Sequence, residues 1–144
     1  MVGSLTYDRI ALQKELERDE GRVPYAYQDH LGYWTIGRGF LIDKAKGGRL
    51  PDKVNDFWLD YLIDEREKQL DQYIPWWRNL SDARQRALIQ MAYQLGVSGL
   101  LGFPKMLAAL QAENWGEAYR QALDSKWAKV DTPERAQKVA AMFL

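Results

Sequence analysis

The sequence predicts a mainly helical α+β protein with two lobes: a small antiparallel sheet in the N-terminal lobe, helices in the C-terminal lobe, and a long helix that joins them. Three observations lead to this prediction. Two short aromatic and β-branched runs flank a turn within residues 24–36, which is typical of a hairpin. Apolar residues recur at helical spacing through residues 52–73. After Pro75, glycine, proline and capping residues divide the chain into short helices.

We expect one domain across residues 1–144, because a chain of this length can bury one sizeable core but is too short for a large enzyme. The N-terminal lobe is predicted at about residues 15–55 and the connecting helix at about 52–73. The C-terminal lobe is predicted at about 76–144, with helix 7–20 packed on it.

The composition argues against several classes of protein. The chain has no cysteine, so it can form neither disulfides nor a thiolate metal site. Its 20 Lys and Arg balance 20 Asp and Glu, without the basic excess of a nucleic-acid binder. Residues 1–14 carry charges close to every apolar position, unlike a signal peptide or membrane span. We therefore expect no nucleic-acid partner, no membrane insertion, and a chain that is soluble where it is made.

The first predicted helix spans residues 7–20, where apolar side chains alternate with charged ones and Gly21 supplies the stop. Asp8 suits its first turn. The hairpin runs follow, with a turn at residues 29–32. Gly37 and Gly39 then allow a tight bend into residues 40–42, and we expect a mobile loop at 44–51.

The remaining helices have readable start and stop signals. Pro75 ends the long helix. Further helices are predicted from the cap Ser81 to Leu95 with Gly96 as the stop, from Pro104 to about Ala112, after the capping pair Asn114 and Glu117, and from Thr132-Pro133 onward.

Glu20, Asp29 and Thr35 are the candidate catalytic residues. Breaking a glycosidic bond requires one acid to protonate the leaving oxygen and one carboxylate to act at the opposite face of the sugar. Glu20 would lie at the C-terminal end of a helix, whose dipole favours the protonated carboxyl, whereas Asp29 would lie in a polar turn and stay ionised. Taken singly, each acid is more often a solvated surface group. Their joint spacing with Thr35 favours the catalytic interpretation.

The pattern Glu20-x8-Asp29-x5-Thr35, with glycines at 21, 37 and 39, resembles the phage-type lysozymes of the T-even kind, glycoside hydrolase family 24. The likeness continues in the C-terminal half, in residues 87–91, 94–96, 99, 102–103, 115–118, 125–127 and 132–136. It therefore covers about residues 10–143, in the family's order. One departure is Phe40, where the best-known members have a histidine after Gly-x-Gly.

The resemblance implies roles for single residues. Glu20 corresponds to the proton donor, Asp29 to the group that activates water, and Thr35 to the hydroxyl that holds this water. It also implies hydrolysis with inversion, in which the carboxyl groups stand roughly 6.5 to 9.5 Å apart. Arg135 corresponds to a supporting arginine that reaches toward the catalytic glutamate. The candidates for substrate binding are Leu41, Tyr93 and Gln94; neither a metal nor a cofactor is expected.

The function implied is that of an endolysin muramidase, which cleaves the β-1,4 bond between N-acetylmuramic acid and N-acetylglucosamine in peptidoglycan and causes host lysis. Such a protein is expected as a monomer in the host bacterial cytoplasm, released to the periplasm and wall with the help of a holin. Two alternatives stay open. One is a lytic transglycosylase, which forms 1,6-anhydro ends, and the other is a wall-binding module without catalysis.

Overall fold

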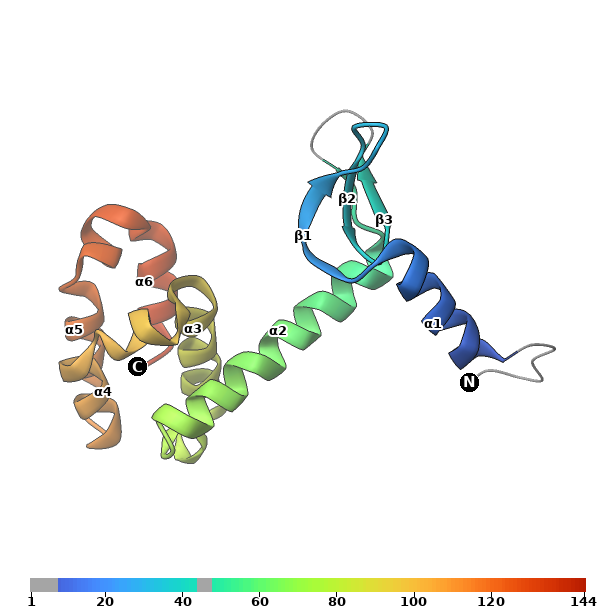
Figure 1. Cartoon of the computed structure of the whole chain (residues 1–144). Helices are drawn as coiled ribbons and strands as arrows, with labels where there is room; N and C mark the ends of the chain where they lie inside the picture. Colours follow the sequence, from blue (N-terminus) through green and yellow to red (C-terminus); the bar gives the residue numbers. More distant parts are fainter. Residues whose placement is uncertain (1–7, 44–47) are drawn as a thin grey trace. The chain divides into compact units, whose positions relative to one another are not determined.

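The computed structural model describes residues 8–43 and 48–144, so part of the predicted 44–51 loop lies outside the described residues. The chain divides into two compact units, Met1–Asn55 and Asp56–Leu144. The first contains a helix and a small sheet, and the second is helical (Figure 1). The predicted fold class, mainly helical α+β with a small antiparallel sheet, is confirmed. The packing of helix 7–20 on the C-terminal lobe stays a prediction.

Helix α1, Arg9–Glu20, has the predicted cap and stop. The Asp8 carboxylate accepts hydrogen bonds from the backbone N–H groups of Ile10 (3.0 Å) and Ala11 (3.1 Å), which satisfies two donors of the first turn. Gly21 ends the helix with φ 81°, a conformation that glycine adopts without steric cost. Glu20 is therefore the last helical residue of α1.

The sheet consists of β1 (Val23–Gln28), β2 (Trp34–Gly37) and β3 (Phe40–Asp43), in the order β1-β2-β3 with antiparallel pairing. Figure 1 shows these strands as one small curved sheet. The predicted hairpin and the bend after it are both confirmed. Gly37 (φ 69°) and Gly39 (φ 77°) make the bend in a conformation that other residues rarely adopt. The central strand β2 thus has a hydrogen-bonded neighbour on each side.

Helix α2, Asp52–Tyr73, has the predicted bounds. It contains the point, between Asn55 and Asp56, at which the chain divides into its two units. Its last turns belong to the core of the second unit, where Leu70 is fully buried.

The second unit contains a series of helices after α2. They are η1 (Trp77–Asn79), α3 (Asp82–Leu101), α4 (Pro104–Gln111), α5 (Trp115–Leu123), η2 (Trp127–Asp131) and α6 (Pro133–Ala141). The predicted caps are confirmed at two of them. The Ser81 hydroxyl accepts from the Arg84 N–H, and the Asn114 amide oxygen accepts from the Glu117 N–H. Pro104 and Pro133 occupy first-turn positions as expected.

The predicted helix stop at Gly96 is confirmed, because its backbone (φ 75°, ψ 162°) is not helical and α3 consists of two helical segments that meet at this kink. Two features of this unit were not predicted. The first is the second segment of α3, which reaches Leu101 and in which Leu100 is buried in the core with no exposed surface. The second is η2, a π-helical turn in which Trp127 is buried.

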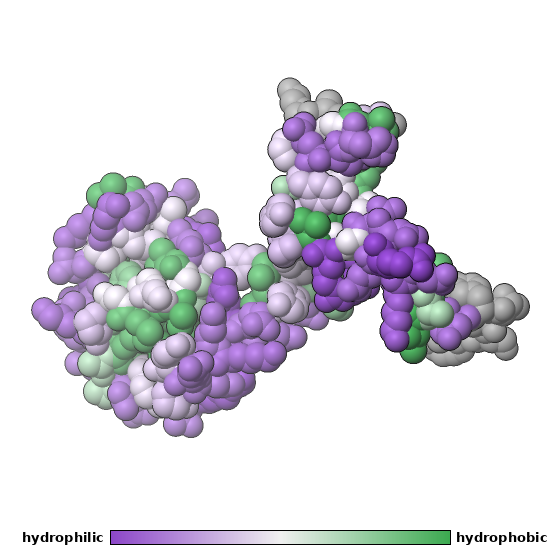
Figure 2. Space-filling view, viewed as in Figure 1, coloured by the Kyte–Doolittle hydropathy of each residue, from purple (hydrophilic) through white to green (hydrophobic). Residues whose placement is uncertain are grey.

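The core of the second unit joins side chains from α2 through to the residues after α6. Its largest fully buried members are Trp77, Phe143, Leu70, Ile74, Leu88, Met91, Leu100, Met106 and Leu110. Figure 2 shows that hydrophilic side chains occupy much of the visible surface of this unit, with apolar patches between them. Because the core comes from several helices, this unit is a firm scaffold for the side chains on its surface.

Candidate active site

Glu20 lies at the point where α1 meets the bend between β2 and β3. Its side chain is exposed, and one neighbour is the backbone of Gly39. A Cβ atom added at Gly39 would fall 2.9 Å from the carboxyl carbon of Glu20, closer than real Cβ atoms approach other atoms. Glycine therefore suits this position because of its positive φ, and the Glu20 carboxyl lies in the space that a Cβ atom at Gly39 would use.

Asp29 lies in the turn directly after β1, at the other end of the hairpin. Its Oδ1 atom accepts hydrogen bonds from the backbone N–H groups of Leu31 (2.8 Å) and Tyr33 (2.9 Å). Its own backbone donates to the Tyr33 carbonyl and accepts from Gly32. The turn thus fixes the Asp29 side chain through Oδ1, as an aspartate with two local backbone donors is fixed in an Asx-type turn.

Thr35 lies on the central strand β2 and is the one buried polar side chain among the residues that the structure describes, with 4% of its surface exposed. It pairs with Tyr27 on β1 and with Leu41 on β3. Its hydroxyl donates to the Tyr33 carbonyl oxygen at 3.1 Å. With its proton used there, the hydroxyl oxygen keeps its lone pairs for accepting a hydrogen bond.

The structure brings Asp29 and Thr35 together through Tyr33, whose N–H binds the first side chain and whose carbonyl accepts from the second. Glu20 lies near the opposite end of the hydrogen-bonded ladder between β1 and β2. At that end Val23 pairs with Gly37, whereas Gln28 pairs with Trp34 beside the turn that holds Asp29. The ladder from Trp34 to Gly37 is roughly 10 Å long, at about 3.4 Å per residue.

Of the three predicted substrate-binding residues, Leu41 belongs to the sheet. It lies on β3 opposite Thr35, and 53% of its surface is exposed. An exposed leucine beside the candidate catalytic threonine can contact the apolar face of a sugar ring. Its role stays a prediction.

Gln94 links three elements of the second unit through its amide. The amide oxygen accepts from the Trp127 indole N–H at 3.0 Å, and the amide nitrogen donates to the Thr132 hydroxyl at 3.0 Å. These bonds connect α3 with η2 and with the residue before α6. The amide keeps one further N–H and one further lone pair, so fewer hydrogen bonds remain for a sugar. Binding of a sugar by Gln94 stays a prediction.

Tyr93 and Arg135 line one hollow of the second unit, together with Leu59, Ile63, Ile89 and Gln90. Its volume is about 230 Å³. The predicted supporting residue and one predicted substrate-binding residue are thus neighbours in space although they are far apart in the sequence. The walls are mainly apolar, and Arg135 supplies the charge.

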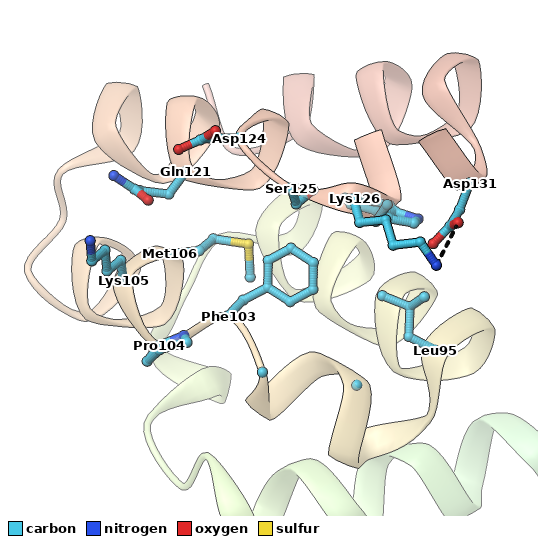
Figure 3. A pocket seen from close by; sticks show the side chains of 13 residues that line it. Leu95, Phe103, Pro104, Lys105, Met106, Gln121, Asp124, Ser125, Lys126 and Asp131 are labelled. Atoms are coloured by element: carbon cyan, nitrogen blue, oxygen red, sulfur yellow. Dashed lines mark ion pairs between the residues drawn. The ribbon is translucent and has the colours of Figure 1, made fainter. Parts of the chain in front are cut away.

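A larger pocket of about 610 Å³ opens between α3, α4, α5 and η2 (Figure 3). Its wall combines Phe103, Met106 and Trp127 with groups of both charges, and the Lys126 ammonium reaches Asp131 at 3.5 Å. The Lys129 ammonium, hydrogen-bonded to Asp124 at 2.5 Å, holds the pKa of that carboxyl below its ordinary value. Sequence reasoning missed this pocket, because its wall comes from four elements that no local motif connects.

Sequence reasoning also missed the ion pairs around Glu17, one helical turn before Glu20. The Glu17 carboxylate contacts Arg22 at 3.3 Å and Arg38 at 3.1 Å. The only local signal was the spacing of Glu17 and Glu20, which places both on one side of α1.

Within residues 8–43 and 48–144, no three His, Cys, Asp or Glu side chains are grouped so that they could hold a metal ion. None of the helices in the described part of the chain has the length and apolar character needed to cross a membrane.

The family model described as phage lysozyme matches residues 17–141. The chain belongs to the phage lysozyme family. It is 25% and 26% identical to the probable T4-type lysozymes 1 and 2 of Dictyostelium discoideum, each over 92% of this chain and 93% of the relative. It is also 31% identical, over 94% of its length, to the pre-baseplate central spike protein Gp5 of Enterobacteria phage T4, of which it spans 28%.

Membership of the phage lysozyme family confirms the resemblance seen in the sequence and supports a lysozyme-like glycosidase that acts on peptidoglycan. The matched range includes all of the predicted site residues. The individual roles of these residues stay predictions.

Proposed function

We propose that this chain is a muramidase that hydrolyses the β-1,4 bond between N-acetylmuramic acid and N-acetylglucosamine in peptidoglycan with inversion. Glu20 is the general acid, Asp29 is the general base, and Thr35 holds the attacking water. The observation that carries the proposal is the shared attachment of Asp29 and Thr35 to the Tyr33 backbone, with Glu20 at the other end of the ladder.

The hydrogen-bond directions at this site suit a water molecule that attacks. The Thr35 proton is donated to the Tyr33 carbonyl, so a water beside it must donate to the Thr35 oxygen. The same water donates its second proton toward the Asp29 carboxylate, and a lone pair remains for the anomeric carbon. Because both protein groups are fixed to one backbone segment, the water is oriented before the substrate reacts.

In the reaction, Glu20 protonates the oxygen of the leaving sugar while the glycosidic bond breaks. Water adds to the opposite face of the anomeric carbon, and its proton passes to Asp29. Each carboxyl then returns to its starting state by proton exchange with solvent. A ladder of roughly 10 Å between the two ends leaves the room that the inverting reaction needs for a water and a sugar.

The second unit supplies further contacts to the glycan in this proposal. Tyr93 and Arg135 offer an aromatic ring and a cation at one hollow, and Leu41 in the first unit offers an apolar side chain beside Thr35. Gln94 adds the remaining N–H of its amide. The protein acts as a monomer and needs no cofactor.

The biological role that we propose is host lysis by an endolysin that gathers in the bacterial cytoplasm and reaches the wall once a holin opens the membrane. Similarity to a phage spike protein favours a second route, in which the same chemistry is delivered by the phage particle. Mass spectrometry of purified particles separates the two, because only the second route places the chain in the particle.

One pair of measurements distinguishes the proposed muramidase from the lytic transglycosylase and from the non-catalytic wall-binding module. A digest of purified peptidoglycan should give products with hydrolysed reducing ends, whereas a transglycosylase gives ends lighter by one water. Glu20→Gln should lower the rate by about a hundredfold or more, the low end for removal of a general acid. Unchanged lysis by this variant would favour the wall-binding module.

A further inference from the structure

Building on the proposed role of Glu20 as the acid, we infer that Glu17 is a positioning residue for it. Its carboxylate, held by Arg22 and Arg38, fixes the end of α1 to the bend against which the Glu20 side chain lies. This assignment concerns three residues that the sequence pattern does not single out.

One carboxylate connects three separate segments of the first unit. Glu17 lies on α1, Arg22 lies between α1 and β1, and Arg38 lies in the bend between β2 and β3. Oε2 of Glu17 is 3.1 Å from Nη2 of Arg38 and 3.3 Å from Nη2 of Arg22, and Oε1 is 3.3 Å from Nε of Arg22. The Glu17 carbonyl also accepts the Gly21 N–H at 2.8 Å, which closes the last turn of the helix.

The connection bears on Glu20 because Arg38 and Gly39 are consecutive residues of the same bend. Glu17 holds Arg38, while the Glu20 carboxyl lies against Gly39. The two glutamates are three residues apart and so share one side of α1. A bend released from Glu17 can move, and the space beside Gly39 that defines the Glu20 position moves with it.

Exposure indicates that these ion pairs matter more for position than for stability. The side chains of Arg38, Glu17 and Arg22 are 33%, 40% and 65% exposed. Ion pairs exposed to this degree contribute little to folding stability. A misplacement of about 1 Å at a catalytic group, by contrast, can lower a rate by about a hundredfold. Loss of the network should therefore reduce turnover while the fold persists.

The chain offers a matched control on the same helix. Asp19 forms an ion pair with its neighbour Arg18 at 2.9 Å, and both side chains are more than 60% exposed. The two hydrogen bonds between Arg18 and Asp19 lie within α1. Asp19→Asn removes the same charge as Glu17→Gln, at a position next to Glu20, without releasing the bend.

The test compares kcat, KM and melting temperature on soluble peptidoglycan strands for Glu17→Gln, Arg38→Gln and Asp19→Asn. The first two variants should each lower kcat by about tenfold, with KM within about twofold of wild type. Their melting temperatures should fall by no more than about 2 °C, because the pairs are exposed. Asp19→Asn should keep kcat within about twofold.

Two further variants separate positioning from structure. Arg38→Lys keeps the charge and should retain most of the turnover that Arg38→Gln loses. The double variant Glu17→Gln with Arg38→Gln should be no slower than the slower single variant, because both changes break the same contact. If Glu17→Gln does not fold, the difference in kcat between Arg38→Lys and Arg38→Gln tests the inference instead.

Wild-type kcat in both Glu17→Gln and Arg38→Gln, while Glu20→Gln is inactive, would overturn this inference and leave the proposed function standing. An equal loss in Asp19→Asn would also overturn it, because the effect would then be one of charge alone. Full activity in Glu20→Gln would instead remove the proposed function on which the inference rests.

Discussion

The Asp29 carboxylate and the Thr35 hydroxyl are attached to the same peptide segment: Asp29 accepts from the Tyr33 N–H at 2.9 Å, and Thr35 donates to the Tyr33 carbonyl at 3.1 Å. The proposed base and the proposed water-holding hydroxyl are therefore both tied to the backbone of one residue. This relationship decides what substitutions at either residue should do.

Asp29→Asn should lower kcat by about a hundredfold or more while the fold is kept. The amide oxygen of asparagine can still accept from Leu31 and Tyr33, so the turn survives, but the base is lost. Kinetics on purified wall and a thermal melt check this together. Retained activity would indicate that no base is used, as in a transglycosylase.

Thr35→Val should lower kcat by about tenfold or more, because valine has the same shape but cannot accept a hydrogen bond from water. It also removes one of the two hydrogen bonds that the Tyr33 carbonyl accepts, at a cost of about 1 kcal/mol in stability, while the bond from the Asp29 N–H remains. Thr35→Ser keeps the hydroxyl and is the matched control. Equal turnover in the valine and serine variants would show that the hydroxyl does not hold the water.

Gly39→Ala should reduce both stability and activity. The positive φ alone costs on the order of 1 kcal/mol, and the added Cβ also displaces the Glu20 carboxyl. Gly96→Ala is the control for backbone strain, since Gly96 has φ 75° and a Cβ there would meet nothing within 4 Å. Turnover measured well below both melting temperatures should fall only for Gly39→Ala. A similar fall in both variants would contradict the contact with Glu20.

Asp71 should make the stability of the second unit depend on pH in the acid range. The hydrogen bond from the Arg78 guanidinium, and then that from the Trp77 indole, hold the pKa of Asp71 below its ordinary value of 3.8. A carboxyl with a lowered folded pKa stabilises the protein above the unfolded value, and this contribution is lost as the pH falls through the folded value. Melting temperatures measured from pH 5 downward should therefore fall less steeply for Asp71→Asn, and equal slopes would contradict the prediction.

Local sequence signals predicted most of the fold because each works over a few residues. Asp8 and Gly21 bound α1, and Ser81 and Asn114 cap their helices as expected. Gly96 also ends its helix as expected. The features that were not predicted involve residues buried by distant parts of the chain: Leu100, in the helical segment after Gly96, and Trp127, in the π-helical turn, both belong to a core that several helices supply.

The candidate site also combines features that follow from local sequence signals with features that depend on distant contacts. The spacing of Glu20, Asp29 and Thr35 follows from a helix stop and a hairpin, so sequence could place them at the two ends of one small sheet. The ion pairs of Glu17 depend on side chains from three segments, and the bonds of the Gln94 amide depend on partners more than 30 residues away. Neither arrangement has a signature within one stretch of sequence.

The measurement that tests the central claim most directly is a proton NMR spectrum of the first reducing ends formed when the enzyme digests soluble peptidoglycan strands. Attack by a water held between Asp29 and Thr35, on the face opposite Glu20, should give the α-anomer first, with the β-anomer appearing only by later mutarotation. A β-anomer as the first product, or a 1,6-anhydro end, would contradict the account.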